Sequence, residues 1–347
     1  MLNAGKCRTV PSPAHKGPLS SVPFSFFPVP LFVFTPVNVN FLEVCLDSHP
    51  DRQFVDFILL GLNQGFRLGY TNSVVPVGRT RNLLSVDKHK TGVAEAILKE
   101  LNRGHTVGPF NEPPTFPFHS SPLGAVPKKD GSVRLILDLS CPRGQSINEG
   151  IFKEDYSVVY SKFDDAVDMM RSLGPHSFMA KIDTRHAFRI CPVHPIDWGL
   201  LGYCFDGRYF MDTRLPFGGR SSPFIFNAVA QAFHWIIKQH GILHLLHYLD
   251  DFFLANKNKN SCSLDFHLTL QIFNSLGVPI ADDKLEGPAQ VITYLGLEID
   301  MVSMCIRLAR DELLDLKEKL GGWISKKNCT KRELLSLIGS LPFACKD

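Results

Sequence analysis

The apolar positions in the middle of this 347-residue chain come in short runs separated by polar turn residues. One run, 178–183, ends in an aspartate, and the runs 243–248 and 252–255 flank Asp250 and Asp251. Runs of this length bounded by turn residues are typical of β-strands, so the pattern predicts a hairpin with the Asp pair at its tip. Charges in such a place need a salt-bridge partner or a metal ion, because an unpaired buried charge is costly. An exposed Asp-Asp turn is the alternative.

Longer segments with apolar residues on one side predict helices, and a Thr330-x-x-Glu333 capping box opens one of them. Asp130-Gly131, with apolar residues on both sides, predicts the turn of a further hairpin. Prolines at 109, 113, 114 and 117 end the first helix and predict an extended linker. The predicted helices are 91–103, 224–233, 311–323 and 330–343.

The first forty residues differ from the rest of the chain. Residues 22–39 are rich in Phe, Val and Pro, and the prolines interrupt the apolar run too often for a membrane-spanning helix. The segment also lacks the basic start and small-residue cleavage site of a signal peptide. We therefore expect residues 1–43 to be irregular or disordered, the protein to be intracellular in the cytoplasm or nucleus, and no membrane partner.

The net charge of +3 excludes a strong overall positive field. Residues 301–347 hold nine Lys or Arg and six Asp or Glu, so the excess is local. A basic region suits contacts with a phosphate backbone, and a solvated helix face is the alternative. The nine cysteines form no C-x-x-C pair and indicate buried thiols in a reducing compartment. Histidines 240, 244 and 247 fit core or surface positions better than a zinc site.

Three carboxylates, Asp183, Asp250 and Asp251, fall at strand ends that can lie side by side. Two Mg²⁺ ions held a few ångströms apart can activate an attacking hydroxyl and a departing pyrophosphate together. Mg²⁺ usually takes only one or two protein carboxylates, plus water and substrate phosphates. The three aspartates would therefore suffice for a nucleotidyl-transfer site.

In six sequence segments, given below, the chain resembles a reverse transcriptase, an RNA-directed DNA polymerase. Other stretches, at 120–125, 138–144 and 330–339, are most similar to DIRS-like retrotransposons, which encode a tyrosine recombinase. The resemblance extends from about Val44 to the last residue. The segments that carry it are Val126 to Arg134 (VPKKDGSVR), 181–183 (KID), 215–223 (LPFGGRSSP), 248–251 (YLDD), 283–284 (DK) and 294–296 (YLG).

The resemblance implies an α+β right-hand polymerase with fingers, a ferredoxin-like palm and a partial thumb. Residues 44–118 would form a helical lead-in and the extended linker, and 119–299 the fingers and palm. Residues 300–347 would form partial thumb or connection helices, ending before any RNase H domain. The implied activity is template-directed DNA synthesis with two Mg²⁺, or Mn²⁺ in their place. The implied partners are an RNA or DNA template-primer and dNTPs, with no stable protein partner. A decayed, non-catalytic retroelement fragment that only binds nucleic acid is the alternative.

The resemblance also implies roles for individual residues. Asp183, Asp250 and Asp251 would be catalytic and bind metal, with the Thr184 backbone carbonyl as a further ligand. The expected nucleotide-binding residues are Lys128, Arg134, Phe188, Phe217, Gly218 and Lys284, and the expected primer grip is Tyr294, Leu295 and Gly296.

Several of these residues also have simpler interpretations. Lys128 and Arg134 could belong to an ordinary surface turn, although Arg offers a planar fork and Lys a mobile charge for phosphate oxygens. Lys284 is a candidate general acid for the leaving pyrophosphate, or a surface lysine. Phe188 is either a ring that excludes a ribose 2′-hydroxyl or a core residue.

Overall fold

The computed structural model describes residues 33–344 except 73–74, 76–77, 129 and 325. Two compact units divide the chain. The first contains the described residues up to Val159 together with Arg185–Ile236 and Phe273–Pro279. The second contains Tyr160–Thr184, Ile237–Ile272 and the described residues from Ile280 onward.

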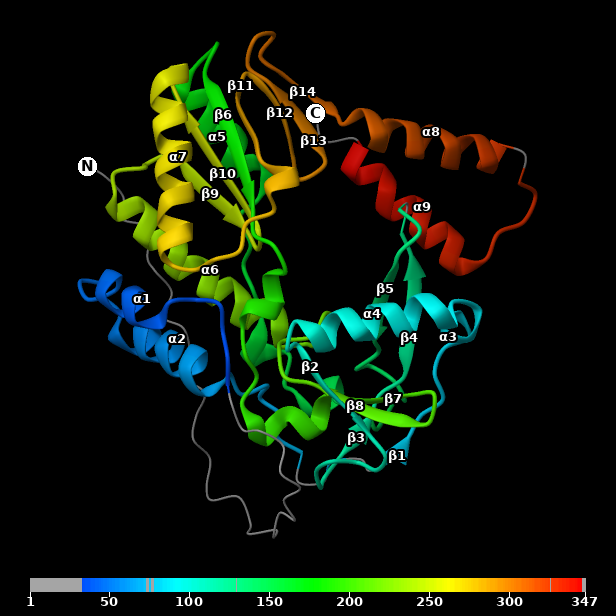
Figure 1. Ribbon diagram of the computed structural model, residues 1–347. Helices are drawn as coiled ribbons and strands as arrows, with labels where there is room; N and C mark the ends of the chain where they lie inside the picture. The colour runs from blue at the N-terminus through cyan, green and yellow to red at the C-terminus, as the bar shows by residue number, and fades with distance from the viewer. Residues whose placement is uncertain (1–32, 73–74, 76–77, 129, 325, 345–347) are drawn as a thin grey trace. The chain divides into compact units, whose positions relative to one another are not determined.

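The second unit is built on a four-stranded antiparallel sheet in the order β11-β6-β10-β9. Its central strand β10 buries four consecutive apolar residues, 252–255, so both faces of the sheet are covered. In Figure 1, helix α7 (Lys259–Ser275) crosses in front of this sheet. The strands are β6 (Phe178–Asp183), β9 (Leu245–Tyr248), β10 (Asp251–Asn256) and β11 (Glu286–Ala289).

A hydrophobic core joins this sheet to one helix and a second sheet. Helix α5 (Phe163–Leu173) contributes Phe163, Ala166 and Met170, which pack with Met179 of β6 and Phe253 of β10. The second sheet is an antiparallel meander of β12 (Val291–Tyr294), β13 (Leu297–Asp300) and β14 (Cys305–Leu308). This core holds the ends of β6 and β10 in place.

The first unit contains a five-stranded sheet in the order β1-β3-β7-β8-β2 and a separate hairpin. The sheet strands are β1 (Gly78–Arg79), β2 (Thr106–Phe110), β3 (His119–Ser120), β7 (Gly202–Phe205) and β8 (Arg208–Asp212). The hairpin pairs β4 (Leu123–Pro127) with β5 (Val133–Leu137), which confirms the turn predicted at Asp130-Gly131.

Helices surround these strands. Helix α6 (Ser222–Gln239) begins in the first unit and ends in the second. The others of the first unit are α1 (Val39–Cys45), α2 (Arg52–Gln64), α3 (Leu84–Lys88) and α4 (Lys90–Asn102). Short 3₁₀ helices lie at Asn148–Gly150, Glu154–Tyr156, Ala187–Ile190, Pro195–Leu201 and Asp282–Lys284.

The predicted helices are present, with bounds shifted at their ends. The last two are α8 (Arg310–Ile324) and α9 (Lys331–Ala344). The predicted capping box opens α9: the Thr330 amide donates to Glu333 Oε2 at 2.8 Å, and the Glu333 amide donates to Thr330 Oγ1 at 3.3 Å. Two orphan amides of the helix start are therefore satisfied.

Two parts of the predicted organisation are wrong. Residues 39–43 are helical in α1, because the Asn38 side chain caps the helix and Leu42 is buried. The predicted extended linker contains strand β2, which pairs with β8 in spite of its proline. That pairing spans a register shift between Val107 and Phe110, which accommodates the proline. Residues 1–32, also predicted to be irregular, lie outside the described part of the chain.

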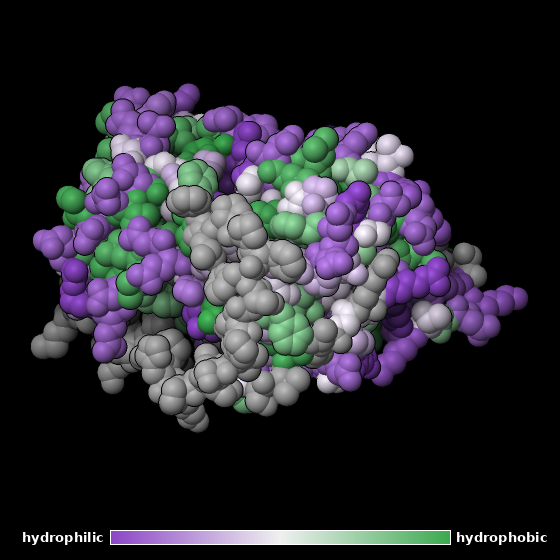
Figure 2. Space-filling view, turned by 60° about the horizontal axis from the view of Figure 1, so that its bottom comes forward, coloured by the Kyte–Doolittle hydropathy of each residue, from purple (hydrophilic) through white to green (hydrophobic). Residues whose placement is uncertain are grey.

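The described surface mixes polar and apolar residues. Figure 2 shows hydrophilic side chains over the visible face with hydrophobic ones interspersed between them. Across the residues that the structure describes, no helix combines the length and apolar character needed to span a membrane. The described cysteines are all free thiols, at 45, 141, 191, 204, 262, 305 and 329.

Candidate active site

Strand pairing in the second unit brings the predicted carboxylates together. Asp183, the last residue of β6, is the register partner of Asp251, the first residue of β10. Asp250 lies in the turn just before β10, and its carbonyl accepts the Thr184 amide at 2.9 Å. The Asp183 carbonyl accepts the Ala281 amide at 2.9 Å, which ties a third segment to the same place. The backbone therefore positions three acidic residues within one strand end.

The turn that carries Asp250 is tight and strained. Tyr248 pairs with Asp251, so only Leu249 and Asp250 connect the two strands. Leu249 has a φ of 52°, a left-handed conformation that costs a non-glycine residue about 1 to 2 kcal/mol. Strained backbone of this kind clusters at functional sites.

The ammonium group of Lys284 contacts one of the carboxylates directly. The Lys284 amine donates to Asp183 Oδ2 at 2.7 Å, and this hydrogen bond raises the pKa of Lys284. Burial, followed by the charges of Asp250 and Asp183, raises the pKa of Asp251 to about 6. Burial also raises the pKa of Asp250. Negative charge is thus held in excess at this strand end.

The chemistry of this donor set fits Mg²⁺. All of the ligands are oxygens, as Mg²⁺ prefers, and the carboxylates outnumber the nearby ammonium group. In the described chain, however, no three His, Cys, Asp or Glu side chains are grouped closely enough to hold a metal ion by themselves. Mg²⁺ commonly completes its shell with water and substrate phosphates, so one or two carboxylates from the protein are sufficient. The metal site stays a prediction.

Thr184 is held rigidly beside the aspartates. Its side chain is 1% exposed, and it forms a β-bridge with Ile280. Its hydroxyl has no hydrogen-bond partner within the described residues. The backbone of Thr184 is therefore well ordered where the prediction places a carbonyl ligand.

The predicted primer-grip residues form a two-residue hairpin turn in the same unit. Tyr294 pairs with Leu297, and Leu295 and Gly296 have φ values of 48° and 81°. Tyr294 is fully buried and its ring stacks on Phe253 at 4.6 Å between centroids. Tyr294 thus anchors the turn in the core, while Leu295 and Gly296 form its tip.

The predicted triphosphate contacts lie in the first unit. Lys128 follows β4, and its amide donates to the Ser132 carbonyl at 2.8 Å to close the hairpin. Arg134 pairs with Val126 on the adjacent strand. Both basic side chains are exposed, so both can reach an anionic ligand.

Phe188, Phe217 and Gly218 are brought together in the first unit as well. The rings of Phe188 and Phe217 are 5.1 Å apart, and Phe188 also contacts Phe226 at 5.4 Å. Phe188 is 9% exposed and Phe217 is 50% exposed. Gly218 has a φ of 91°, which favours glycine. Phe188 is therefore packed like a core residue against Phe226, and its ring also contacts the half-exposed Phe217.

Sequence reasoning missed Asn148, which fixes this loop. Its side-chain amide donates to the Gly218 carbonyl at 2.9 Å, and its Oδ1 accepts the Arg220 amide at 2.8 Å. Asn148 is 70 residues from Gly218 in sequence, and no local motif marks it.

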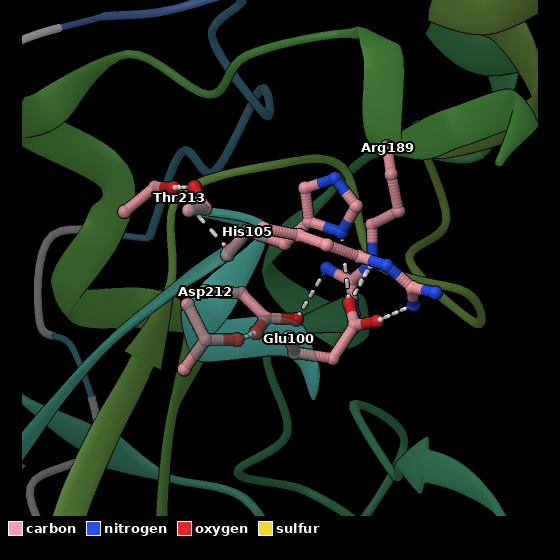
Figure 3. Close-up of polar contacts among 8 residues, drawn as sticks. Glu100, His105, Arg189, Asp212 and Thr213 are labelled. Atoms are coloured by element: carbon pink, nitrogen blue, oxygen red, sulfur yellow. Dashed lines mark hydrogen bonds and ion pairs between the residues drawn. The ribbon is translucent and has the colours of Figure 1, made fainter. Parts of the chain in front are cut away.

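A polar network next to Phe188 was also missed (Figure 3). Arg189 donates to Asp212 Oδ2 at 2.6 Å and lies 3.4 Å from Glu100 Oε2. His105 is 3.0 Å from the same Glu100 oxygen. Burial alone would raise the pKa of Glu100, but the hydrogen bond with His105 and the charge of Arg189 outweigh it and lower that pKa to about 2. The network anchors the helix that carries Phe188.

Comparisons with known proteins agree with this geometry. A family model described as "Reverse transcriptase (RNA-dependent DNA polymerase)" matches residues 126–299, half of the chain. The Pro-Pol polyprotein of simian foamy virus type 1 is 22% identical over 225 residues, 65% of this chain and 18% of that protein. The Gag-Pol polyprotein of walleye dermal sarcoma virus is 32% identical over 116 residues, 33% of this chain and 7% of that protein. The chain thus spans less than a fifth of these relatives.

Solved structures share the fold. The foamy viral protease-reverse transcriptase in complex with RNA/DNA hybrid has a TM-score of 0.60 at 17% identity, covering 92% of this chain and 42% of that one. The dRH form of the same protein, in complex with double-stranded DNA, has a TM-score of 0.60 at 17% identity, covering 92% and 54%. The predicted α+β polymerase fold is confirmed.

Proposed function

The chain belongs to the reverse transcriptase (RNA-dependent DNA polymerase) family, and from that membership we propose that it synthesises DNA on a nucleic-acid template from dNTPs. The observation that carries the proposal is the pairing of Asp183 with Asp251 beside Asp250. The structural relatives were solved with double-stranded DNA and with an RNA/DNA hybrid, which supports a template-primer duplex as the partner.

In the proposed reaction Asp183, the Thr184 carbonyl, Asp250 and Asp251 would hold two Mg²⁺. When bound, these ions activate the primer 3′-hydroxyl and stabilise charge on the leaving pyrophosphate. Lys284 is protonated by virtue of its bond to Asp183 and can give a proton to that pyrophosphate. The exposed Lys128 and Arg134 would bind the triphosphate.

The remaining roles concern the sugar and the primer. Phe188 and Phe217 would pack beneath the ribose, and the left-handed Gly218 would let the backbone approach the nucleotide. The Leu295-Gly296 tip would position the primer end, with Tyr294 anchoring it.

The type of retroelement and the cellular location are part of the same proposal. The stretches at 120–125, 138–144 and 330–339 support a DIRS-like element as the source. The free described thiols suit an intracellular location. A non-catalytic fragment is disfavoured, because the aspartates, Lys128 and Arg134 are all present in their expected elements.

Primer extension with purified protein tests the proposal on RNA and DNA templates. Asp250→Asn removes one charge with little change of shape, and we expect extension to slow by at least about a hundredfold. Duplex binding, measured by fluorescence anisotropy, should stay within about twofold of wild type, since binding rests mainly on basic side chains.

Asp168→Asn is the matched control for this experiment. Asp168 lies on α5 of the same unit, and its side chain is 77% exposed. The control should extend primers at the wild-type rate. Normal extension by Asp250→Asn would refute the assignment of the carboxylates.

A further inference from the structure

A small cavity in the first unit is lined by an unusual number of basic side chains. Its volume is about 180 Å³. Pockets for drug-sized molecules usually measure about 300 to 1,000 Å³, so this one suits an ion or a very small molecule. The basic residues that line it are Arg103, His105, His186, Arg189 and Arg214.

Two carboxylates neutralise only part of this charge. Glu100 contacts Arg103 at 3.1 Å and His105 at 3.0 Å, and it shares Arg189 with Asp212. Figure 3 shows the contacts that the His105 ring and the Arg189 guanidinium make with the Glu100 carboxylate. Three guanidinium groups against two carboxylates leave a positive excess.

Arg214 holds that excess. It is 3% exposed and lines the cavity, and within the described residues no carboxylate forms an ion pair with its guanidinium. The central carbon of the guanidinium lies 5.5 Å from the centroid of the Phe34 ring. Burial and then the charge of Arg189 lower the pKa of Arg214 to about 10, so it stays protonated at neutral pH. A buried cation without an anion is costly.

The backbone fixes Arg214 in this position. The neighbouring Thr213 amide donates to the His105 carbonyl at 2.9 Å, and Thr213 Oγ1 donates to the Gly104 carbonyl at 3.2 Å. The Leu215 amide donates to the Cys191 carbonyl at 3.0 Å. The backbone that carries Arg214 is therefore held from both sides.

His186 adds a polar group to the cavity wall. Its ring meets His105 edge-on at 5.7 Å between centroids. An imidazole ring always carries at least one N–H that can donate a hydrogen bond. Donors on separate segments thus line the same small space.

We propose that this cavity is a binding site for one phosphate-sized oxyanion, with Arg214 as the principal ligand and Arg103 and His186 as supporting donors. A guanidinium fork matches phosphate oxygens bidentately. Inorganic phosphate and the terminal phosphate of a nucleotide present the same chemistry. Asp183, Asp250 and Asp251 belong to the other unit, and none of them lines the cavity.

Calorimetric titration of the full chain with inorganic phosphate, at constant ionic strength, tests this proposal. Wild type should bind one phosphate saturably. Arg214→Gln should weaken binding by about tenfold or more, the loss expected when a charged hydrogen-bonding group is removed. Arg81→Gln, which removes an exposed arginine of the same unit outside the cavity, should bind like wild type.

Two further arms keep the result interpretable. Arg103→Gln alters a side chain that is 44% exposed, so it serves if Arg214→Gln does not fold, and it should also weaken binding. Deoxyadenosine monophosphate and deoxyadenosine compared in the same titration identify the source: binding of the nucleotide but not the nucleoside supports a nucleotide phosphate. Absence of saturable binding in wild type, or equal affinity in wild type, Arg214→Gln and Arg103→Gln, would overturn the proposal.

Discussion

The strand end in the second unit and the cavity in the first unit carry opposite charge imbalances. At the strand end, the carboxylates of Asp183, Asp250 and Asp251 outnumber the ammonium groups of Lys181 and Lys284, and the pKa of Asp251 rises to about 6 through burial and like charge. In the cavity, no carboxylate of the described residues pairs with Arg214, and its pKa falls to about 10. Each unit holds charge at a cost in stability, as is common at functional sites.

The two imbalances arise differently. The aspartates lie at or next to the ends of two paired strands, so a short motif in each strand is enough to create the cluster. The basic residues of the cavity come from the segment between α4 and β2, from the start and interior of the 3₁₀ helix at Ala187–Ile190, and from the segment after β8. A site of the first kind can be read from local sequence, and a site of the second kind cannot.

The largest stability effect that the comparison predicts is at Asp251. The folded-state pKa of about 6 lies above the ordinary 3.8, so the folded protein loses stability as the pH rises from about 4 through 6. Asp251→Asn removes this penalty, and we expect it to raise the free energy of unfolding by about 2 to 3 kcal/mol at pH 7. Urea denaturation of both proteins at pH 4 and pH 7 measures this increase in the free energy of unfolding, which should vanish near pH 4.

Mg²⁺ gives this prediction an internal check. An ion that binds the folded carboxylates raises the melting temperature of wild type and raises that of Asp251→Asn less. If Asp251→Asn were no more stable than wild type at pH 7, the strand end would not carry excess negative charge. The proposed contrast with the positively charged cavity would then be wrong.

The second-largest expected effect is a gain in stability when the buried charge of Arg214 is removed. Its folded-state pKa of about 10 lies below the ordinary 12.5, so the penalty on the charged form is fully present at neutral pH and is relieved only above about pH 10. Arg214→Met should raise the free energy of unfolding by about 1 to 2 kcal/mol in phosphate-free buffer, because it replaces an unpaired buried charge with an apolar chain.

Adding phosphate should reduce the difference in free energy of unfolding between Arg214→Met and wild type, because phosphate stabilises only the protein that binds it. Chemical denaturation of both proteins, with and without phosphate, measures the stability difference and its change on adding phosphate. A destabilised Arg214→Met, with no response of wild type to phosphate, would mean that the guanidinium is already compensated.

The smallest effect concerns Phe188, which adjoins Arg189 of the cavity wall. If its ring excludes the ribose 2′-hydroxyl, Phe188→Val should lower the ratio of kcat/KM for dNTP over rNTP by about tenfold, the discrimination that a few carbon atoms provide. Phosphate binding in the cavity should not change. Steady-state incorporation of both nucleotides by wild type and variant measures the ratio.

Phe226→Val is the control for Phe188, because Phe226 is fully buried and contacts the same ring. It should cost roughly 3 kcal/mol of stability without altering sugar preference. If Phe188→Val shows the same pattern as this control, Phe188 is a core residue.

Much of the second unit could be predicted from local sequence. The apolar runs 178–183, 243–248 and 252–255 predicted β6, β9 and β10, and the structure pairs them. The Lys284 contact with Asp183 spans 101 residues, and it was expected only in the sense that both belong to one site. The burial of Tyr294 against Phe253 was not expected, because a tyrosine beside a turn resembles a surface residue until the packing is known.

In the first unit, contacts between residues far apart in the sequence could not be predicted. The prolines from 109 to 117 predicted a linker where strand β2 lies, whereas the pairing partner of Thr106, Asp212, lies 106 residues away in the sequence. Asn148, Glu100 and Arg189 likewise act on residues distant in the chain. None of these partnerships leaves a local pattern.

The sequence by itself determined the family and the polymerase fold through the resemblance of its motifs. It also determined the strand-end position of the three aspartates, because β-strand and turn patterns depend on neighbouring residues. The tertiary structure alone decided which charges are compensated. Asp183 has its ammonium partner and Arg214 has no anion within the described residues, because compensation depends on which side chains distant in sequence are brought within a few ångströms of each other.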